Sequence, residues 1–235
     1  MSAEALSLAF FDPVRHLHGT ARAGFTLLYE DGVPTALGSG PGVFEENGAY
    51  RAVVEDRLEL SFVPVSEPAV LAGARSSVCR VAGRVDGTEV DCLGTLTDTR
   101  NPPEWVELDA VRGVSALFDS EHAVLAVARR PRGTLGHGQE LVSAALLSGG
   151  ELVAVENARL STVYDKDGRQ RSAGIELWLP GEDFPRRAFG EVLAGTTLGL
   201  PGLQVNAAVF AWRMEGREGA GAYDVTIRAE APTAA

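Results

Sequence analysis

Apolar and polar residues alternate with a period of two in segment after segment of this chain of 235 residues. In the run RLELSFVPV, Leu58, Leu60 and Phe62 fall on one face of an extended chain, and the residues between them fall on the other. Side chains of a β-strand point alternately to its two faces, so the pattern indicates a strand with one buried and one wet side. The same residues wound as a helix would scatter their apolar side chains around it, so this period restricts the chain to paired strands.

Similar segments are separated by sequences that favour tight turns. Asp-Gly, Asn-Gly, Gly-Gly and Pro-Gly pairs stand at 31–32, 47–48, 86–87, 149–150 and 201–202, and DKDG stands at 165–168. Helical spacing is limited to a turn or two near the N-terminus and around 68–73. The sequence therefore predicts an all-β antiparallel meander, with further strands at 25–29, 49–55, 78–85, 89–97, 105–118, 123–129, 141–147, 151–164, 171–179, 189–200, 205–214 and 222–228.

Some of the predicted strands are apolar on both faces, and the clearest is VNAAVFAW at 205–212. A closed or nearly closed barrel with something packed outside it, or two barrels side by side, would bury both faces. We therefore expect a lipocalin-like barrel or two packed β-barrel halves. The pair Pro102-Pro103 is the best candidate for a domain boundary. It divides the chain into halves at 1–101 and 102–235, unless the two halves form one continuous unit.

The net charge of −11 bears on the class of partner. A field of this sign repels nucleic acid and anionic membranes, so neither is expected as a partner. The N-terminal sequence MSAEALSLAFFDP lacks the basic and apolar regions of a leader, and no window reaches the length of a membrane span. We expect a cytoplasmic protein without membrane insertion that binds a hydrophobic small molecule, and the oligomeric state is left open.

Two cysteines fall in the predicted hairpin VCRVAGRVDGTEVDCLG. A two-residue turn at 86–87 places Cys79 opposite Gly94 and Cys92 opposite Val81. The thiols would then stand diagonally on one face, roughly 7–8 Å apart, which is beyond comfortable disulfide reach. We expect both to be reduced and buried.

A polar cluster, GHGQE at 136–140, stands directly before an apolar predicted strand. If the following hairpin has a three-residue loop at 148–150, Glu140 shares an apolar wall with Glu156. Desolvation on such a wall would raise the pKa of a carboxyl and suit it to act as a general acid, with His137 orienting or reprotonating it. If the loop has two residues, Glu140 lies opposite Arg159 and forms a cross-strand ion pair with no catalytic role.

Aromatic residues on the predicted strands are candidates for lining a cavity that takes an isoprenoid or a cationic intermediate. For any single one of them, packing in the core is the simpler interpretation. The candidate substrate-binding residues are Trp105, Trp178, Phe62, Tyr164 and Glu156, with Trp212 and Phe210 as further aromatic neighbours.

No cofactor is expected. The sequence contains no nucleophile elbow, phosphate-binding glycine loop or dinucleotide fingerprint, and two cysteines cannot form a thiolate metal cluster. A metal site remains an alternative, since His16 and His18 would project from one face of an extended segment and join His137 and Glu140. The spacing favours no particular metal, so we expect none.

The order of several segments resembles a known family. The run CRVAGRVDGTEVDCLGTLTDTRNPPEW is followed by AVLAVARRP, by GHGQE and by a hairpin ending in ARLSTVYDKDGRQRSAGIELW. This order, over about residues 78–200, resembles the two-barrel, lipocalin-like family typified by carotenoid 1,2-hydratases. Where such proteins often carry an Arg-Asp-His-Ser-Trp-Gly-like run, this chain has TDTR at 97–100, in which only Asp98 matches.

The resemblance implies a two-barrel fold, a substrate of isoprenoid or polyketide type, and a catalytic role for Asp98 beside Glu140 and His137. The first functional hypothesis is an enzyme that encloses such a molecule and catalyses acid-assisted hydration, cyclisation or isomerisation. The second is a non-catalytic lipocalin-like carrier or sensor. The enzyme requires Glu140 in an enclosed pocket without an arginine partner, whereas the carrier requires a pocket lined by apolar side chains alone. A third possibility, a purely structural interaction module, would have no pocket.

Overall fold

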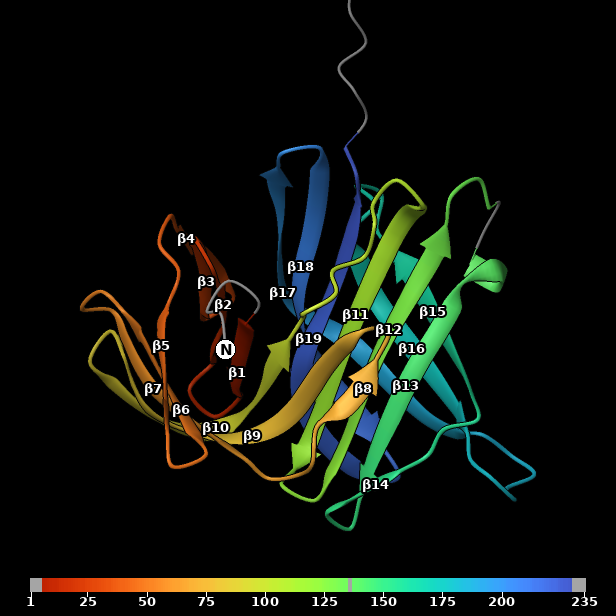
Figure 1. The fold of residues 1–235 in the computed structure, drawn as a ribbon, viewed down its shortest axis with the longest axis horizontal. Coiled ribbons are helices and arrows are strands. Elements are labelled where there is room, and N and C mark those ends of the chain that lie inside the picture. Colours follow the sequence, from red (N-terminus) through yellow and green to blue (C-terminus); the bar gives the residue numbers. More distant parts are fainter. Residues whose placement is uncertain (1–5, 135–136, 230–235) are drawn as a thin grey trace, which may run out of the picture.

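The computed structural model describes residues 6–134 and 137–229, and this part of the chain is all-β. Its nineteen strands form two antiparallel sheets, each curled around its own core, that lie side by side (Figure 1). Apart from the strands, the described ranges contain one short 3-10 turn, η2 (His137–Gln139). No helix in these ranges is long and apolar enough to cross a membrane. The predicted fold class is confirmed.

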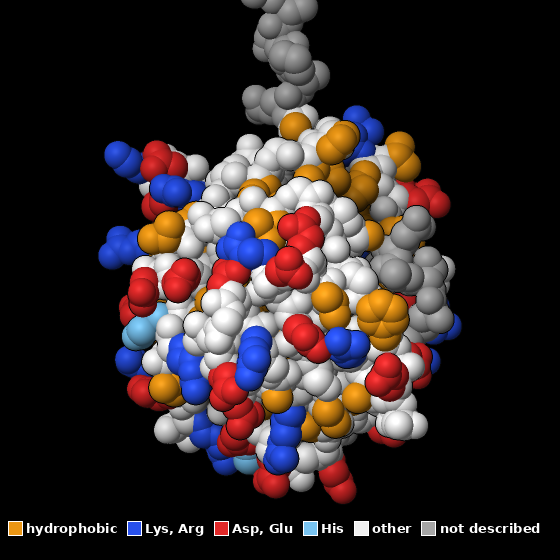
Figure 2. Space-filling model, turned by 90° about the vertical axis from the view of Figure 1, so that its left-hand side faces the viewer, with side chains coloured by type: hydrophobic (Ala, Val, Ile, Leu, Met, Phe, Trp, Pro, Cys, Tyr) orange, Lys and Arg blue, Asp and Glu red, His pale blue; other side chains and the backbone are white. Residues whose placement is uncertain are grey.

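The first sheet runs in the order β4-β3-β2-β1-β10-β9-β7-β6-β5, with β8 paired to β9 outside this path. Acidic and basic side chains are mixed across the face of the molecule that this sheet presents to solvent (Figure 2). Its strands are β1 (Leu6–Asp12), β2 (Leu17–Arg22), β3 (Phe25–Glu30), β4 (Val33–Leu37), β5 (Gly42–Glu46), β6 (Ala49–Val54), β7 (Leu58–Pro64), β8 (Ala69–Leu71), β9 (Ala74–Val85) and β10 (Thr88–Asp98).

The second sheet runs in the order β14-β13-β12-β11-β19-β18-β17-β16-β15. Its edge strands are therefore β14, with β13 next to it, at one side and β15 at the other. Its strands are β11 (Leu108–Asp119), β12 (His122–Pro131), β13 (Leu141–Ser148), β14 (Glu151–Val153), β15 (Asn157–Tyr164), β16 (Gln170–Trp178), β17 (Arg186–Leu200), β18 (Leu203–Met214) and β19 (Arg217–Arg228).

The sequence prediction differs from the structure mainly at the N-terminus. A helical turn or two near the N-terminus and around 68–73 is wrong, since β1, β2 and β8 occupy these segments. In β1, Phe10 packs in the core of the first sheet, whereas Ala9 and Phe11 pack against the second sheet. Burial on both faces removes the alternation that would have revealed the strand. The predicted strand at 151–164 is interrupted at 154–156, and β4 and β5 were not predicted.

The predicted turns adopt left-handed backbone. Asp31, Asn47 and Asp86 have φ of 49°, 52° and 48°, and the glycine after each is also positive, as a two-residue hairpin turn requires. The turn at 86–87 sets the predicted register, with Cys79 opposite Gly94 and Cys92 opposite Val81. Both cysteines are free, and Cys92 is half-buried rather than buried. Burial raises the pKa of each thiol to about 12.

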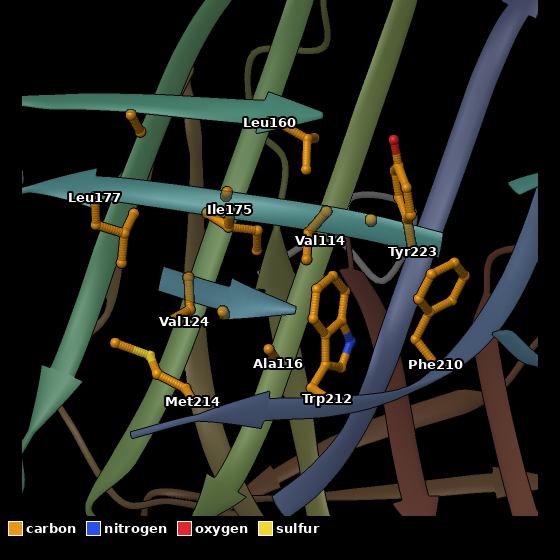
Figure 3. Close-up of a cluster of buried hydrophobic side chains, with 14 of the residues drawn as sticks. Val114, Ala116, Val124, Leu160, Ile175, Leu177, Phe210, Trp212, Met214 and Tyr223 are labelled. Carbon is orange, nitrogen blue, oxygen red and sulfur yellow. The ribbon is translucent and has the colours of Figure 1, made fainter. Parts of the chain in front are cut away.

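The core enclosed by the second sheet contains the largest buried side chains of the chain. Trp212 and Phe210 stack with ring centroids 5.4 Å apart, and Tyr223 meets Phe210 edge to face at 5.3 Å (Figure 3). On β18, alternate residues from Ala208 to Met214 point into this core. On the opposite face of this strand, Val205, Ala207 and Val209 pack between the two sheets, as the apolar run at 205–212 predicted.

The interface between the sheets is apolar with a few buried polar groups. The hydroxyl of Tyr29 donates to the carbonyl oxygen of Ala207 at 3.0 Å. Near it, one carboxylate oxygen of Asp224 accepts from the backbone N–H of Ala208 at 3.3 Å. Burial raises the pKa of Asp224 from its ordinary value of 3.8 to about 6, although the Ala208 N–H and the charge of Arg22 oppose the shift.

We predict that Asp224→Asn changes the pH dependence of stability. Because the folded state holds the Asp224 proton more tightly than the unfolded state, the free energy of unfolding contributed by this group falls as pH rises from about 4 to about 6. The variant lacks this loss, so its stability relative to wild type should rise across that window. Urea unfolding at a series of pH values checks this.

His18 has the opposite effect over a similar window, since burial lowers its pKa to about 4. It is present in both proteins, so its contribution cancels in the difference between them. Two stability curves that run parallel between these pH values would contradict the role assigned to Asp224.

A second prediction concerns the close packing of β17 against Trp212. A Cβ added at Gly190 would lie 2.6 Å from Cε3 of Trp212, inside van der Waals contact. Gly190→Ala should therefore lower the free energy of unfolding by about 1–3 kcal/mol through overpacking. Gly199, on the same strand, has open space at this position, so Gly199→Ala is the matched control and should leave stability nearly unchanged. Equal effects of the two substitutions in thermal unfolding would contradict this account.

Candidate active site

A cleft of about 340 Å³ opens at one end of the core that the second sheet encloses. Its lining combines apolar side chains with charged and polar groups. The residues that line it are Ala110, Arg112, Arg130, Glu140, Tyr164, Gly168, Asn206, Val225 and Ile227.

The strand register arranges these residues in layers. Ala110 pairs with both Arg130 and Ile227, and these three form the outer layer of the cleft. Arg112 pairs with Val225 one inward-facing position deeper along β11. Below this layer the core is filled by apolar and aromatic side chains. The cleft is therefore the unfilled end of a packed barrel interior, with Arg112 at its floor.

Arg112 is almost completely buried and binds groups from several strands. Its Nη1 donates to Oγ1 of Thr162 at 2.8 Å and to the hydroxyl of Tyr223 at 3.1 Å. Its Nη2 donates to the carbonyl oxygen of Leu160 at 2.9 Å and forms an ion pair with Oε2 of Glu140. Each side chain of the ion pair is 1 % exposed. A guanidinium with this number of acceptors is held rigidly in place.

The partners also account for the charge states of the floor. Burial disfavours the charged form of Arg112, but Tyr223 and Glu140 outweigh it and hold the pKa of Arg112 above its ordinary value. Burial raises the pKa of Tyr223 to about 12, so its hydroxyl keeps its proton at neutral pH. The floor thus combines a permanent cation, a carboxylate and a neutral phenol.

Arg112 also bridges a seam in the second sheet, the junction between β13 and β15, where the two strands lie near each other without backbone pairing in the described part of the chain. Among the described residues, β15 is paired only with β16, and β13 is paired only with β12 and β14. Glu140 directly precedes β13, whereas Leu160 and Thr162 lie on β15. The guanidinium therefore connects the two sides of the sheet where no backbone ladder joins them.

The structure matches neither of the two alternatives for Glu140. The hairpin has the two-residue loop, since Ser148 pairs with Glu151. However, β14 ends at Val153, so Arg159 does not come opposite Glu140 and stacks instead over the ring of Trp178, 5.2 Å from its centroid. Glu140 pairs with Arg112, so the condition of a pocket carboxyl without an arginine partner is not met.

The other two predicted catalytic residues are not brought to the cleft by any described contact. His137 lies in η2, and its side chain lies outside the described part of the structure. Asp98 ends β10 in the first sheet, where it is buried and accepts a hydrogen bond from Nε of Arg100 at 2.7 Å. Asp98 does not line the cleft.

Of the predicted substrate-binding residues, Tyr164 alone lines the cleft. Trp178 pairs with Asn157 at the start of β15, at the opposite end of the strand from Tyr164, and Glu156 lies exposed just before that strand. Phe62 is buried in the core of the first sheet. Trp105 is half-buried in the segment between β10 and β11.

The histidine-based metal alternative also differs from the structure. His16 is exposed in a turn with φ of 52°, whereas His18 is buried in β2, so the two do not share one face of a strand. Within the described ranges, no group of three or more His, Cys, Asp or Glu side chains is placed to hold a metal ion.

Two charged residues of the cleft, Arg112 and Arg130, and the Arg112 partner Tyr223 were not predicted from the sequence. One signal was available. On β11 the inward positions are Ala110, Arg112, Val114 and Ala116, so an arginine interrupts an apolar series. A charge at an inward position of a strand indicates a buried partner or a function.

Comparison with known proteins places the fold. No protein-family model matches the chain, and no curated protein matches its sequence. Two solved structures share the fold. One is a protein from Nitrosomonas europaea assigned as AttH, with a TM-score of 0.59 and 14% identity, covering 94% of this chain and 91% of that one. The other is kievitone hydratase from Nectria haematococca, with a TM-score of 0.54 and 11% identity, covering 95% and 87%. The predicted two-barrel fold is confirmed at the level of architecture.

We predict that the two members of the buried ion pair depend on each other for stability. Arg112→Met leaves the Glu140 carboxylate buried without its cation and should lower the free energy of unfolding by about 3–5 kcal/mol. The double variant Arg112→Met with Glu140→Leu removes both charges and should recover most of that loss. Urea unfolding of the two single variants and the double variant measures the coupling. Additive losses would contradict the pairing.

Proposed function

We propose that this chain is a hydratase-type enzyme that binds a small apolar molecule in the cleft and transfers a proton at Glu140. The observation that carries the proposal is the buried Arg112–Glu140 pair at the floor of a cleft that is also lined by the apolar side chains of Ala110, Val225 and Ile227. Such a mixed lining fits an apolar molecule with one reactive polar end.

The acid role expected for Glu140 required a carboxyl without an arginine partner, so the contact with Arg112 favours a base instead. An oxygen of Glu140 accepts a hydrogen bond from the guanidinium, and an acceptor of this kind is suited to take a proton from water. In hydration, the water oxygen forms a bond to one carbon of the alkene and its proton passes to Glu140. The alkene electron pair then takes a proton at the other carbon from the protonated Glu140, which returns to the carboxylate, and dehydration is the reverse.

The comparisons support this reaction class by analogy of fold. One solved structure with the same fold is named a hydratase, and this name describes that protein alone. Isoprenoid and polyketide-like molecules are the substrates that the family resemblance implies. Cyclisation and isomerisation of such molecules instead move protons at carbon without adding water, so incorporation of water oxygen distinguishes hydration from them.

A second candidate is a non-catalytic binding protein, and one observation favours it. The contacts of Arg112 with Leu160, Thr162 and Tyr223 connect strands of the barrel, which gives the ion pair a structural use independent of chemistry. In that case the cleft binds its ligand and releases it unchanged.

The two candidates are separated by turnover in water carrying a heavy oxygen isotope. A panel of isoprenoid and polyketide-like alkenes is incubated with the protein, and mass spectrometry detects incorporation of the label. For any compound converted, Glu140→Gln should lower the rate by about 100-fold or more, the typical loss when a general base is removed. Glu176→Gln is the control, since Glu176 forms a surface ion pair with Arg187 and lies outside the cleft.

Because Glu140→Gln disturbs a buried ion pair, Glu140→Asp is measured beside it and both variants are checked for cooperative unfolding. A folded Glu140→Gln variant with wild-type turnover would contradict the catalytic role. Ligands that bind to the wild type without conversion would favour the binding protein.

A further inference from the structure

The outer layer of the cleft contains a cation that pairs with no described residue. Arg130 lines the cleft and is partly buried. Among the described residues it forms no ion pair or hydrogen bond through its side chain, and its Nε is buried without a hydrogen-bond partner. A buried N–H without an acceptor is costly, so such a group marks a place where a ligand is able to supply one.

Arg112 and Arg129 also have a buried Nε without a partner, but both donate hydrogen bonds through their terminal nitrogens, whereas no such bond is formed by Arg130 among the described residues. Arg129, the preceding residue, points to the other face of β12, where its Nη2 donates to the carbonyl oxygen of Ala72. Arg112 is paired with Glu140. Arg130 lies two residues after the buried Ala128 on β12, so both side chains point to the same face of the strand, and Arg130 faces the cleft.

The balance of charge points in the same direction. The lining of the cleft contains two arginines and one glutamate, so the cleft is locally positive in a chain with a net charge of −11. A positive recess in an acidic protein attracts an anion to that one place. A guanidinium presents parallel N–H donors whose geometry matches a carboxylate.

We infer that the cleft takes a carboxylic acid with an apolar, unsaturated body, and that Arg130 binds its carboxylate. The body then lies along Ala110, Val225 and Ile227. Glu140 precedes Leu141, the partner of Arg129, and so comes beside Arg130, while its carboxylate meets Arg112 in the layer below. The carbon atoms next to the bound carboxylate therefore lie close to Glu140. The use of this acid as a substrate rests on the proposed function, whereas its binding does not.

Binding of the carboxylate by Arg130 would also activate the double bond toward addition of water. In an acid whose double bond is conjugated to the carboxylate, attack by water oxygen pushes the alkene electron pair toward the carboxylate oxygens. A cation at those oxygens stabilises the developing charge. Arg130 is in this sense a specificity-determining residue that also favours the reaction.

The test uses cinnamate as the probe and cinnamamide, which has the same shape without the charge, as its neutral control. Binding is followed by NMR titration, including the side-chain N–H of Arg130. We expect wild type to bind cinnamate more tightly than cinnamamide, and the Arg130 N–H resonance to shift on binding. Arg130→Gln should weaken cinnamate binding by about 10-fold or more, the usual effect of losing a hydrogen bond to a charged group, and leave cinnamamide unaffected.

Arg129→Gln is the matched control, because it removes an adjacent arginine that faces away from the cleft. Arg130→Lys keeps the charge without the two-pronged geometry and should bind cinnamate with intermediate affinity. It also replaces Arg130→Gln if that variant does not fold. Absence of cinnamate binding, equal binding of the two probes by wild type, or cinnamate binding that does not change with Arg130 would overturn the inference.

These outcomes are independent of the test of the proposed function. If cinnamate binding requires Arg130 but no alkene is converted, the hydratase proposal fails and the acid-binding site stands. If hydration of an alkene depends on Glu140 but cinnamate binding does not depend on Arg130, the hydratase proposal stands and the acid-binding site fails.

Discussion

The buried guanidinium of Arg112 is the interaction on which the second sheet depends. A charge in a barrel interior is tolerated only when it is paired and hydrogen-bonded, so Glu140, Thr162, Tyr223 and the carbonyl of Leu160 must all stay in place around it. These groups come from both sides of the seam between β13 and β15. The same contacts that hold the barrel together therefore build the floor of the cleft.

Most of the fold could be predicted because the strands with one wet face, such as β7, show clear alternation, and because the turns carry Asp-Gly or Asn-Gly. Prediction failed where burial on both faces erased that signal, as in β1, where Phe10 and Phe11 pack into different cores. The two apolar faces of β18 pack in different directions, and from the sequence they allowed either one covered barrel or two barrels side by side.

The site was harder to predict than the fold. Glu140 was singled out as a cleft residue from its place before β13, but its partner lies 28 residues away in the sequence, on β11. A hairpin model allows only partners across one turn, so it offered Arg159 and missed Arg112. A charged residue at an inward-facing position of an apolar strand, as at Arg112 and Arg130, was the signal that indicated the cleft. Aromatic residues did not indicate it, since Trp212 and Phe62 are core residues.

The seam has a consequence for how this architecture changes. When backbone pairing closes a barrel all the way round, the number of strands and their stagger set its diameter. The diameter then changes only when a strand is gained or lost. Here, one stretch of the wall is spanned by a side chain. A paired change at positions 112 and 140 would therefore alter the width of the interior at this point without the gain or loss of a strand.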